Sequence, residues 1–448
     1  GFAGSAEPGY NGKKWTLPER IACMAHQTLR SAYDRLSDRF NKFPQGAPPT
    51  ALLHQILQLL FSEKEADLVA LLPIKPFTAA KAAEAWKVGE AEARKTLDNL
   101  ADRAILLDYI GKDGKTRYML PPPMVGFFEF SMMRVREDWD QKTLAELYHQ
   151  YVVVQEDFGR ELFAGATQFG RALVREEAVE ADNTLRVLDY ERASEVINSA
   201  THIGIAMCHC RHIAMHRGHA CDAPMNICMA FNTGADTLIR HGHVRRIDKA
   251  ECRDLLQEAK AHNLVQMGEN AQHNVSFICN CCGCCCEAML AARRFALMHP
   301  VHTTNFLPEI DAQACTGCGK CVGVCPVEAL SLVSAHDPNN HNRKTAQLAE
   351  DRCLGCGVCV KPCAKNAITL TPRKERVLTP ANSVHRFIIQ AIERGKLQNL
   401  LYDNQVYESH RAMGAVLGAL FKLPPVKRAM AKKQMNSRYV DALLAKQK

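Results

Sequence analysis

The distribution of cysteine constrains this chain more than any other feature. The 448 residues include 20 cysteines, and 19 of them lie between residues 208 and 363. Several are adjacent or nearly so: Cys281, Cys282, Cys284, Cys285 and Cys286. A disulfide requires a defined distance between the Cα atoms of its two cysteines, which cysteines adjacent in sequence rarely meet. Metal ligation, in contrast, brings several thiolates to one point. We therefore expect metal centres and a reducing, cytoplasmic setting.

Two cysteine runs share the spacing C-x-x-C-x-x-C-x-x-x-C. The first run, which a proline follows, consists of Cys315, Cys318, Cys321 and Cys325. The second run consists of Cys353, Cys356, Cys359 and Cys363. Three cysteines at this spacing wrap one face of a four-iron cubane, while the fourth is turned away. Structural zinc sites also use C-x-x-C, but two four-cysteine runs with this spacing favour iron-sulfur clusters.

These motifs resemble the bacterial two-cluster ferredoxins over about residues 308–371. The resemblance implies two [4Fe-4S] clusters with crossed ligation. One would be held by Cys315, Cys318, Cys321 and Cys363, and the other by Cys353, Cys356, Cys359 and Cys325. The glycines within the motifs would let the backbone approach the inorganic sulfides. Two departures from the family pattern, Ala364 in place of the second proline and a polar insert at residues 334–344, remove no ligand.

A second set of ten cysteines lies upstream of the ferredoxin motifs. Its members are Cys208, Cys210, Cys221, Cys228, Cys279, Cys281, Cys282, Cys284, Cys285 and Cys286. Successive side chains on a strand point to opposite faces, so Cys281 and Cys282 are not expected to ligate one cluster from the same side. This favours either two further clusters or one larger or irregular cluster. Cys252 stands apart and is expected to be a buried thiol.

The chain as a whole predicts an α+β multidomain protein. The expected parts are a helical and winged-helix-like domain at 1–123, a helical connector at 124–187, a cysteine-rich Fe-S domain at 188–307, a two-[4Fe-4S] ferredoxin domain at 308–371 and a helical basic C-terminal extension at 372–448.

The winged-helix interpretation depends on residues 50–123. Thr78 is a suitable N-cap for a helix over 79–86, a second helix is expected over 90–104, and Asp113-Gly114 indicates a hairpin. Acidic residues outnumber basic ones in the second helix, which disfavours binding to DNA phosphates. A protein-interaction or structural role fits this domain better.

The C-terminal extension pairs an apolar stretch with basic residues. Residues 412–421 are apolar, and lysines and an arginine follow by residue 433. We expect a helix packed on the ferredoxin domain, and the alternative is contact of 412–433 with a membrane surface or an acidic partner. No apolar run approaches the roughly 18 residues that a membrane span requires.

Several cofactor motifs are missing from the sequence. It has neither G-x-G-x-x-G after a strand nor G-x-x-x-x-G-K-[ST], so no nicotinamide or ATP site is indicated. The full pattern resembles proteins of anaerobes described only as 4Fe-4S binding. We interpret the chain as a multi-cluster electron-transfer protein that passes single electrons to or from a redox partner, as one subunit of an anaerobic oxidoreductase complex.

Two alternatives remain at the level of sequence. The first is a reductase whose substrate binds a cluster in the 208–286 region, beside His212 or His216, which stand at helical i, i+4 spacing. The second is a redox-sensing regulator that acts through the winged helix.

Overall fold

The computed structural model describes residues 31–421, except for 112, 164, 180–186, 297–300 and 403–407. The N-terminal helices are α2 (Ala32–Phe40), α3 (Ala51–Leu60), α4 (Glu63–Ala70), α5 (Ala79–Trp86) and α6 (Glu90–Asp102). Ser62 starts α4 through a capping box, in which its hydroxyl accepts from the backbone of Glu65 and the Glu65 carboxylate accepts from its backbone. The helices expected over 79–86 and 90–104 are thus confirmed, the second ending at Asp102.

A β-hairpin follows these helices. Strands β1 (Leu107–Ile110) and β2 (Thr116–Met119) pair antiparallel, as the Asp113-Gly114 turn signal indicates. Phe77, just before α5, adds a bridge to Tyr118. The order of elements is the one that a winged helix requires, and the assignment itself stays a prediction.

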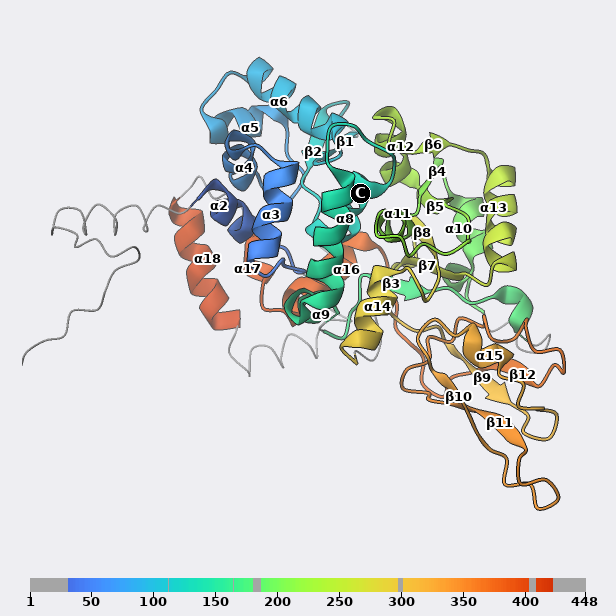
Figure 1. Cartoon of the computed structure of the whole chain (residues 1–448). Helices are drawn as coiled ribbons and strands as arrows, with labels where there is room; N and C mark the ends of the chain where they lie inside the picture. Colours follow the sequence, from blue (N-terminus) through green and yellow to red (C-terminus); the bar gives the residue numbers. More distant parts are fainter. Residues whose placement is uncertain are drawn as a thin grey trace, which may run out of the picture.

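Strand β1 of the hairpin packs against α12 (Figure 1). Asp108 on β1 accepts hydrogen bonds from Arg240 and Thr237 and lies 2.9 Å from Nε2 of His241. Burial alone would raise the pKa of Asp108, but these partners hold it well below its usual range. The hairpin is therefore tied to the sheet domain by ionic contacts.

A six-stranded antiparallel sheet forms the middle of the chain. Its strand order is β3-β7-β8-β5-β4-β6. The strands are β3 (Gly170–Ala172), β4 (Ile203–Met207), β5 (Asn226–Phe231), β6 (Arg245–Arg246), β7 (Val265–Glu269) and β8 (Phe277–Cys281). The helices between and after them are α10 (Ala193–Ser199), α11 (His209–His216), α12 (Asn232–Arg240), α13 (Lys249–Ala261) and α14 (Glu287–Arg294). Strand β3 comes from the range expected to be a helical connector.

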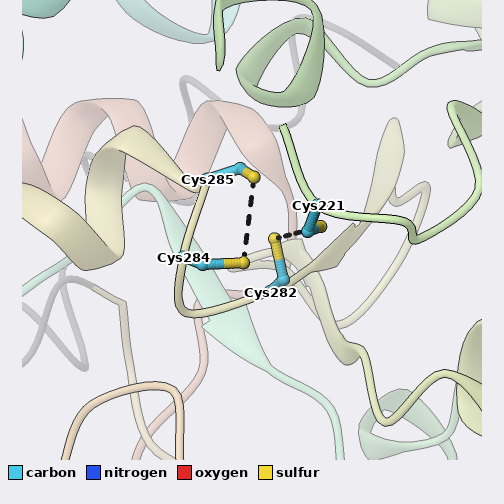
Figure 2. Close-up of side chains that lie close together, drawn as sticks. All are labelled: Cys221, Cys282, Cys284 and Cys285. Carbon is cyan, nitrogen blue, oxygen red and sulfur yellow. Dashed lines mark hydrogen bonds between the residues drawn. The ribbon is translucent and has the colours of Figure 1, made fainter. Parts of the chain in front are cut away.

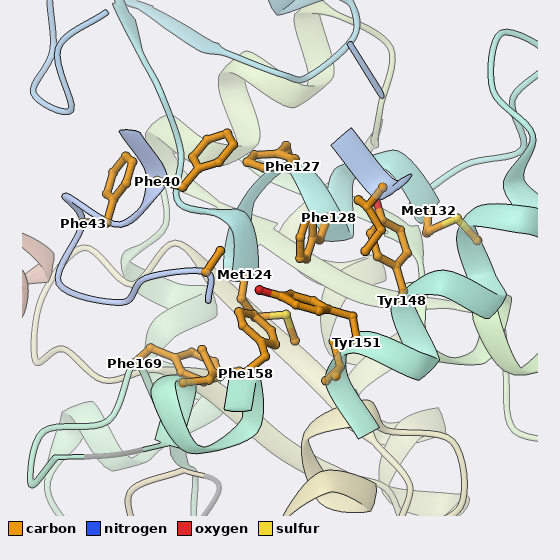
Figure 3. Packing of buried hydrophobic residues seen from close by; sticks show 14 of the residues in the cluster. Phe40, Phe43, Met124, Phe127, Phe128, Met132, Tyr148, Tyr151, Phe158 and Phe169 are labelled. Carbon is orange, nitrogen blue, oxygen red and sulfur yellow. The ribbon is translucent and has the colours of Figure 1, made fainter. Parts of the chain in front are cut away.

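An apolar core joins the N-terminal helices to this sheet. The connector helices are α7 (Phe128–Met132), α8 (Gln141–His149) and α9 (Glu156–Phe163). Aromatic rings on and beside these helices contact one another: Phe127 and Phe128 meet edge-on with ring centroids 5.0 Å apart, and Tyr151 and Phe158 stack with centroids 4.5 Å apart (Figure 3). The same core continues into several cysteines of the sheet domain. The cysteine-rich region is therefore supported by the connector rather than merely linked to it.

The ferredoxin module projects from the rest of the molecule (Figure 1). It consists of β9 (Phe306–Ile310), α15 (Lys320–Gly323), β10 (Leu330–Ser334), β11 (Lys344–Leu348) and β12 (Ile368–Pro372). Strands β9 and β12 pair with each other, as do β10 and β11, both antiparallel. The pair β9 and β12 thus brackets the two cysteine runs in sequence, and the β10–β11 hairpin lies between them.

The C-terminal helices are α16 (Ser383–Glu393), α17 (Leu397–Leu401) and α18 (Glu408–Phe421). Helix α16 and the residues after it contact the connector and the N-terminal helices, because Arg394 and Lys396 both pair with Glu161 of α9 and Phe387 lies edge-on to Phe43. The apolar stretch 412–421 lies on α18, which packs on α17, on the opposite side of the molecule from the ferredoxin module (Figure 1). The expectation that this stretch packs on the ferredoxin module is therefore wrong. The basic residues after 421 lie outside the described residues. No helix in the described part of the chain is long and apolar enough to cross a bilayer.

Candidate metal centres

Two cavities in the ferredoxin module are each lined by four cysteines. The outer site consists of Cys315, Cys318, Cys321 and Cys363. The inner site consists of Cys325, Cys353, Cys356 and Cys359. Each run therefore gives three cysteines to one site and its fourth cysteine to the other. This is the division that the ferredoxin resemblance implies, and four converging thiols are a suitable donor set for a cubane.

Two glycines allow the loops to close around these sites. Gly317 and Gly355 both have φ in the left-handed region, at 69° and 68°. A Cβ at Gly355 would collide with the backbone oxygen of Phe306, and one at Gly317 with that of Lys344. Glycine is required at these two positions because the loop backbone lies close to the start of a neighbouring strand of the module.

The outer and inner sites differ in their access to solvent. Cys318 of the outer site is exposed, whereas Cys353 and Cys359 of the inner site are buried. Burial raises the pKa of Cys353 to about 11, partly offset by a hydrogen bond from the backbone of Gly355 and by the charge of Arg373. Arg373 donates to the carbonyl of Cys353, and the guanidinium of Arg175 lies near the inner-site thiols. The inner site is thus a desolvated group of thiols with two cations beside it.

The ten upstream cysteines separate into two groups. The first is a closed ring of six thiols, which we call the six-thiol ring. Each thiol lies close enough to the next to shift its pKa, in the order Cys208, Cys210, Cys286, Cys281, Cys279, Cys228 and back to Cys208. Four of these residues are buried and two are half-buried.

The secondary structure explains how the six-thiol ring forms. Cys279 and Cys281 are two residues apart on β8, so they share one face of the sheet. Cys228 lies on β5, which pairs with β8. Cys208 and Cys286 are the N-cap residues of α11 and α14, respectively. Two helix starts thus bring thiols to the two central strands of the sheet, which already carry three, and Cys210 completes the ring from the first turn of α11.

The pKa shifts alternate in direction around the six-thiol ring. Interaction with the neighbouring thiols lowers the pKa of Cys208, Cys279 and Cys286. It raises the pKa of the three cysteines between them. A bound metal would displace the remaining thiol protons, because thiolates are the ligating form.

The second group is a compact cluster of four thiols, which we call the four-thiol site. It consists of Cys221, Cys282, Cys284 and Cys285 (Figure 2). Cys221 comes from the loop before β5, and the other three come from the turn between β8 and α14. The structure thus places Cys281 and Cys282, neighbours in sequence, in different groups.

Arg211 lies between the two groups and is fully buried. Its guanidinium donates to the carbonyls of Pro224 and Asn280, both at 2.9 Å. Burial alone would lower the pKa of Arg211, but thiols on both sides, including Cys208 and Cys282, raise it well above its usual range. It is the central positive charge of the ten-cysteine region.

Histidines surround the six-thiol ring but differ in what they can do. Nε2 of His209 lies 3.3 Å from the sulfur of Cys210. His212 is buried; its Nδ1 donates to the carbonyl of Met132, and its Nε2 accepts from His216 at 3.1 Å. A neutral imidazole has one donor and one acceptor, so both nitrogens of His212 are already used.

The ferredoxin module touches the ten-cysteine region directly. Gly283, in the turn that carries the four-thiol site, packs on Pro326, which follows inner-site Cys325; a Cβ at Gly283 would lie 2.9 Å from the Pro326 Cα. Arg293 of α14 donates to the Gly283 carbonyl and to Glu328. This contact joins segments far apart in the sequence, and so does the position of Arg175 beside the inner site. Neither could be predicted from a sequence motif.

Comparison with known proteins bears on the ferredoxin module. Residues 314–367 match the family model of the 4Fe-4S dicluster domain. The chain is an iron-sulfur protein. The matched segment contains all eight cysteines of the outer and inner sites and none of the ten upstream. No curated protein and no solved structure significantly matches this iron-sulfur protein.

Proposed function

We propose that this chain is a multi-cluster electron-transfer protein in which the six-thiol ring holds a third iron-sulfur cluster. The ring is not a compact tetrahedral group: in the described part of the chain, no three of its sulfurs lie all within 4.8 Å of one another. Thiols spread more widely than the ligands of one ion suit a polynuclear cluster, whose irons each bind a different thiolate. Six thiols exceed the four of a cubane, which favours a larger or irregular cluster.

The order of the sites supports a linear path for electrons. The outer site includes the exposed Cys318, whereas Cys353 and Cys359 of the inner site are buried. The inner site lies between it and the sheet domain. The contact between Gly283 and Pro326 is the observation that best supports the proposal. It places the inner site directly against the turn between β8 and α14, which follows Cys281 and precedes Cys286 of the six-thiol ring.

A redox partner protein or subunit would dock where Cys318 is exposed and exchange single electrons with the outer site. Membership in an anaerobic oxidoreductase complex belongs to this proposal. The buried, fully bonded state of His212 gives the reductase alternative less support.

A reductive titration under strictly anaerobic conditions tests the third cluster. Two ferredoxin cubanes accept about two electrons per chain, one each. We expect the wild-type chain to accept more than two electrons and the Cys279→Ala, Cys281→Ala double variant to accept two. The matched control is Cys252→Ala, a buried thiol on α13 that belongs to neither group.

The outcome is read from the electron count and the EPR spectrum together. The control should accept as many electrons as the wild type does, because the thiol of Cys252 contacts Met229 and belongs to neither thiol group. Equal electron counts for the wild type and the double variant, with both ferredoxin signals intact, would refute a redox-active cluster in the six-thiol ring.

A further inference from the structure

The four-thiol site is much more compact than the other cysteine groups. The sulfurs of Cys221 and Cys282 lie 3.7 Å apart, and those of Cys284 and Cys285 lie 3.8 Å apart (Figure 2). All four sulfurs lie within 4.8 Å of one another, which is true of no other group of three or more such ligand atoms among the described residues.

This spacing matches the coordination sphere of one ion. Zinc binds four thiolates tetrahedrally at about 2.3 Å, which places the sulfurs about 3.8 Å apart along the edges of the tetrahedron. In a cubane, each thiolate binds a different iron and points away from the centre, so the four sulfurs lie farther apart. The ferredoxin cysteines provide an internal comparison, since no three of their sulfurs lie all within 4.8 Å of one another.

We propose that Cys221, Cys282, Cys284 and Cys285 bind a single zinc ion and not a cluster. Thiolates are soft ligands that favour zinc among the common divalent ions. Four protein ligands leave no open position, which is the arrangement of a structural zinc site. The complex of one zinc with four thiolates carries a net negative charge, which the buried guanidinium of Arg211 faces.

The position of the zinc ion explains what it does. Cys221 lies in the loop between α11 and β5, and the other three ligands lie in the turn between β8 and α14. Those same segments carry Cys208 and Cys210 on one side and Cys281 and Cys286 on the other. The ion therefore fastens together the two parts of the chain that form the six-thiol ring, without itself carrying electrons. The ten upstream cysteines then divide into six redox ligands and four structural ligands.

Metal analysis of variants tests this assignment. We expect one zinc per wild-type chain, loss of that zinc in Cys284→Ser, and unchanged zinc in Cys252→Ala. Cys284 is the exposed member of the site, so its replacement disturbs the core least. Iron should stay at no less than the amount of the two ferredoxin clusters in all three proteins. Loss of iron rather than zinc in Cys284→Ser would overturn the proposal.

X-ray absorption at the zinc edge of the wild-type chain provides a measurement that needs no variant. Four sulfur neighbours at about 2.3 Å are expected. A zinc shell of nitrogen or oxygen, absence of zinc, or iron in this site, single or clustered, would overturn it. A failed third cluster would appear instead as missing iron and missing electrons with zinc unchanged, so the two proposals fail separately.

Discussion

Replacing Arg211 should affect both stability and redox potential, and two variants separate these effects. Arg211→Met removes the positive charge and both hydrogen bonds, whereas Arg211→Lys keeps the charge. The guanidinium donates to the half-buried carbonyl of Pro224 and to the buried carbonyl of Asn280. A buried polar group left without its partner costs about 1–3 kcal/mol.

The loss of both bonds in Arg211→Met should lower the free energy of unfolding by about 2–6 kcal/mol. This is a large part of the 5–15 kcal/mol typical of a domain. The shorter ammonium of Arg211→Lys can reach one carbonyl, so about half of that loss is expected. Urea unfolding under anaerobic conditions measures it.

The charge effect is read from the reduction potential. Two unit charges 4 Å apart interact by about 4 kcal/mol at an effective dielectric constant of 20. The charge of a cluster is spread out and lies farther than this from the guanidinium. We therefore expect Arg211→Met to lower the reduction potential of the cluster in the six-thiol ring by on the order of 50–100 mV, where about 59 mV corresponds to a tenfold change in the equilibrium constant for one electron.

Arg211→Lys should shift the potential of the six-thiol ring by much less than Arg211→Met. EPR-monitored redox titration of the two variants and the wild type measures this difference. Equal shifts in both variants, or a higher potential in Arg211→Met, would refute the electrostatic argument. The ferredoxin potentials provide the internal reference.

Three further predictions follow from single contacts. Gly283→Ala should lower the free energy of unfolding by about 1–3 kcal/mol, because the new Cβ would meet the backbone of Pro326. It should also slow the transfer of electrons out of the inner site, as measured by flash-reduction kinetics. Gly323→Ala, which has open space around it, is the matched control, and equal kinetics in the two variants would contradict the path. Gly355→Ala should lose iron from the inner site, as assayed by iron content, because the residue has positive φ and no room for a Cβ; full iron occupancy would contradict it. His241→Gln should remove a pH dependence of thermal stability. A hydrogen bond to Asp108 raises the pKa of His241, so the contribution of His241 to stability is complete below about pH 6.5 and is lost as pH rises through the folded pKa. Parallel curves of melting temperature against pH for the wild type and the variant would contradict this.

The ferredoxin module could be predicted from sequence because its ligands are local. The spacing within each run fixes which three cysteines face one site, and only the fourth must cross to the other. The hairpin at Asp113-Gly114 and the helix after Thr78 were likewise predictable, since turn and cap signals act over a few residues.

The division of the ten upstream cysteines could be predicted only in part. Alternation along a strand separates Cys281 from Cys282, as expected. Nothing in the spacing indicates that Cys221 joins Cys282, because that pairing depends on how β5 and β8 lie in the sheet. The position of α16 against Glu161 was missed for the same reason: a long-range ion pair leaves no periodic signal in the sequence.

Iron and acid-labile sulfide content of the anaerobically purified wild-type chain tests the central claim most directly. The outer and inner sites alone account for about 8 irons per chain. The account predicts a clear excess, at about 12 or more, which would be assigned to the six-thiol ring. A value of about 8, with both ferredoxin EPR signals at full intensity, would contradict the third cluster.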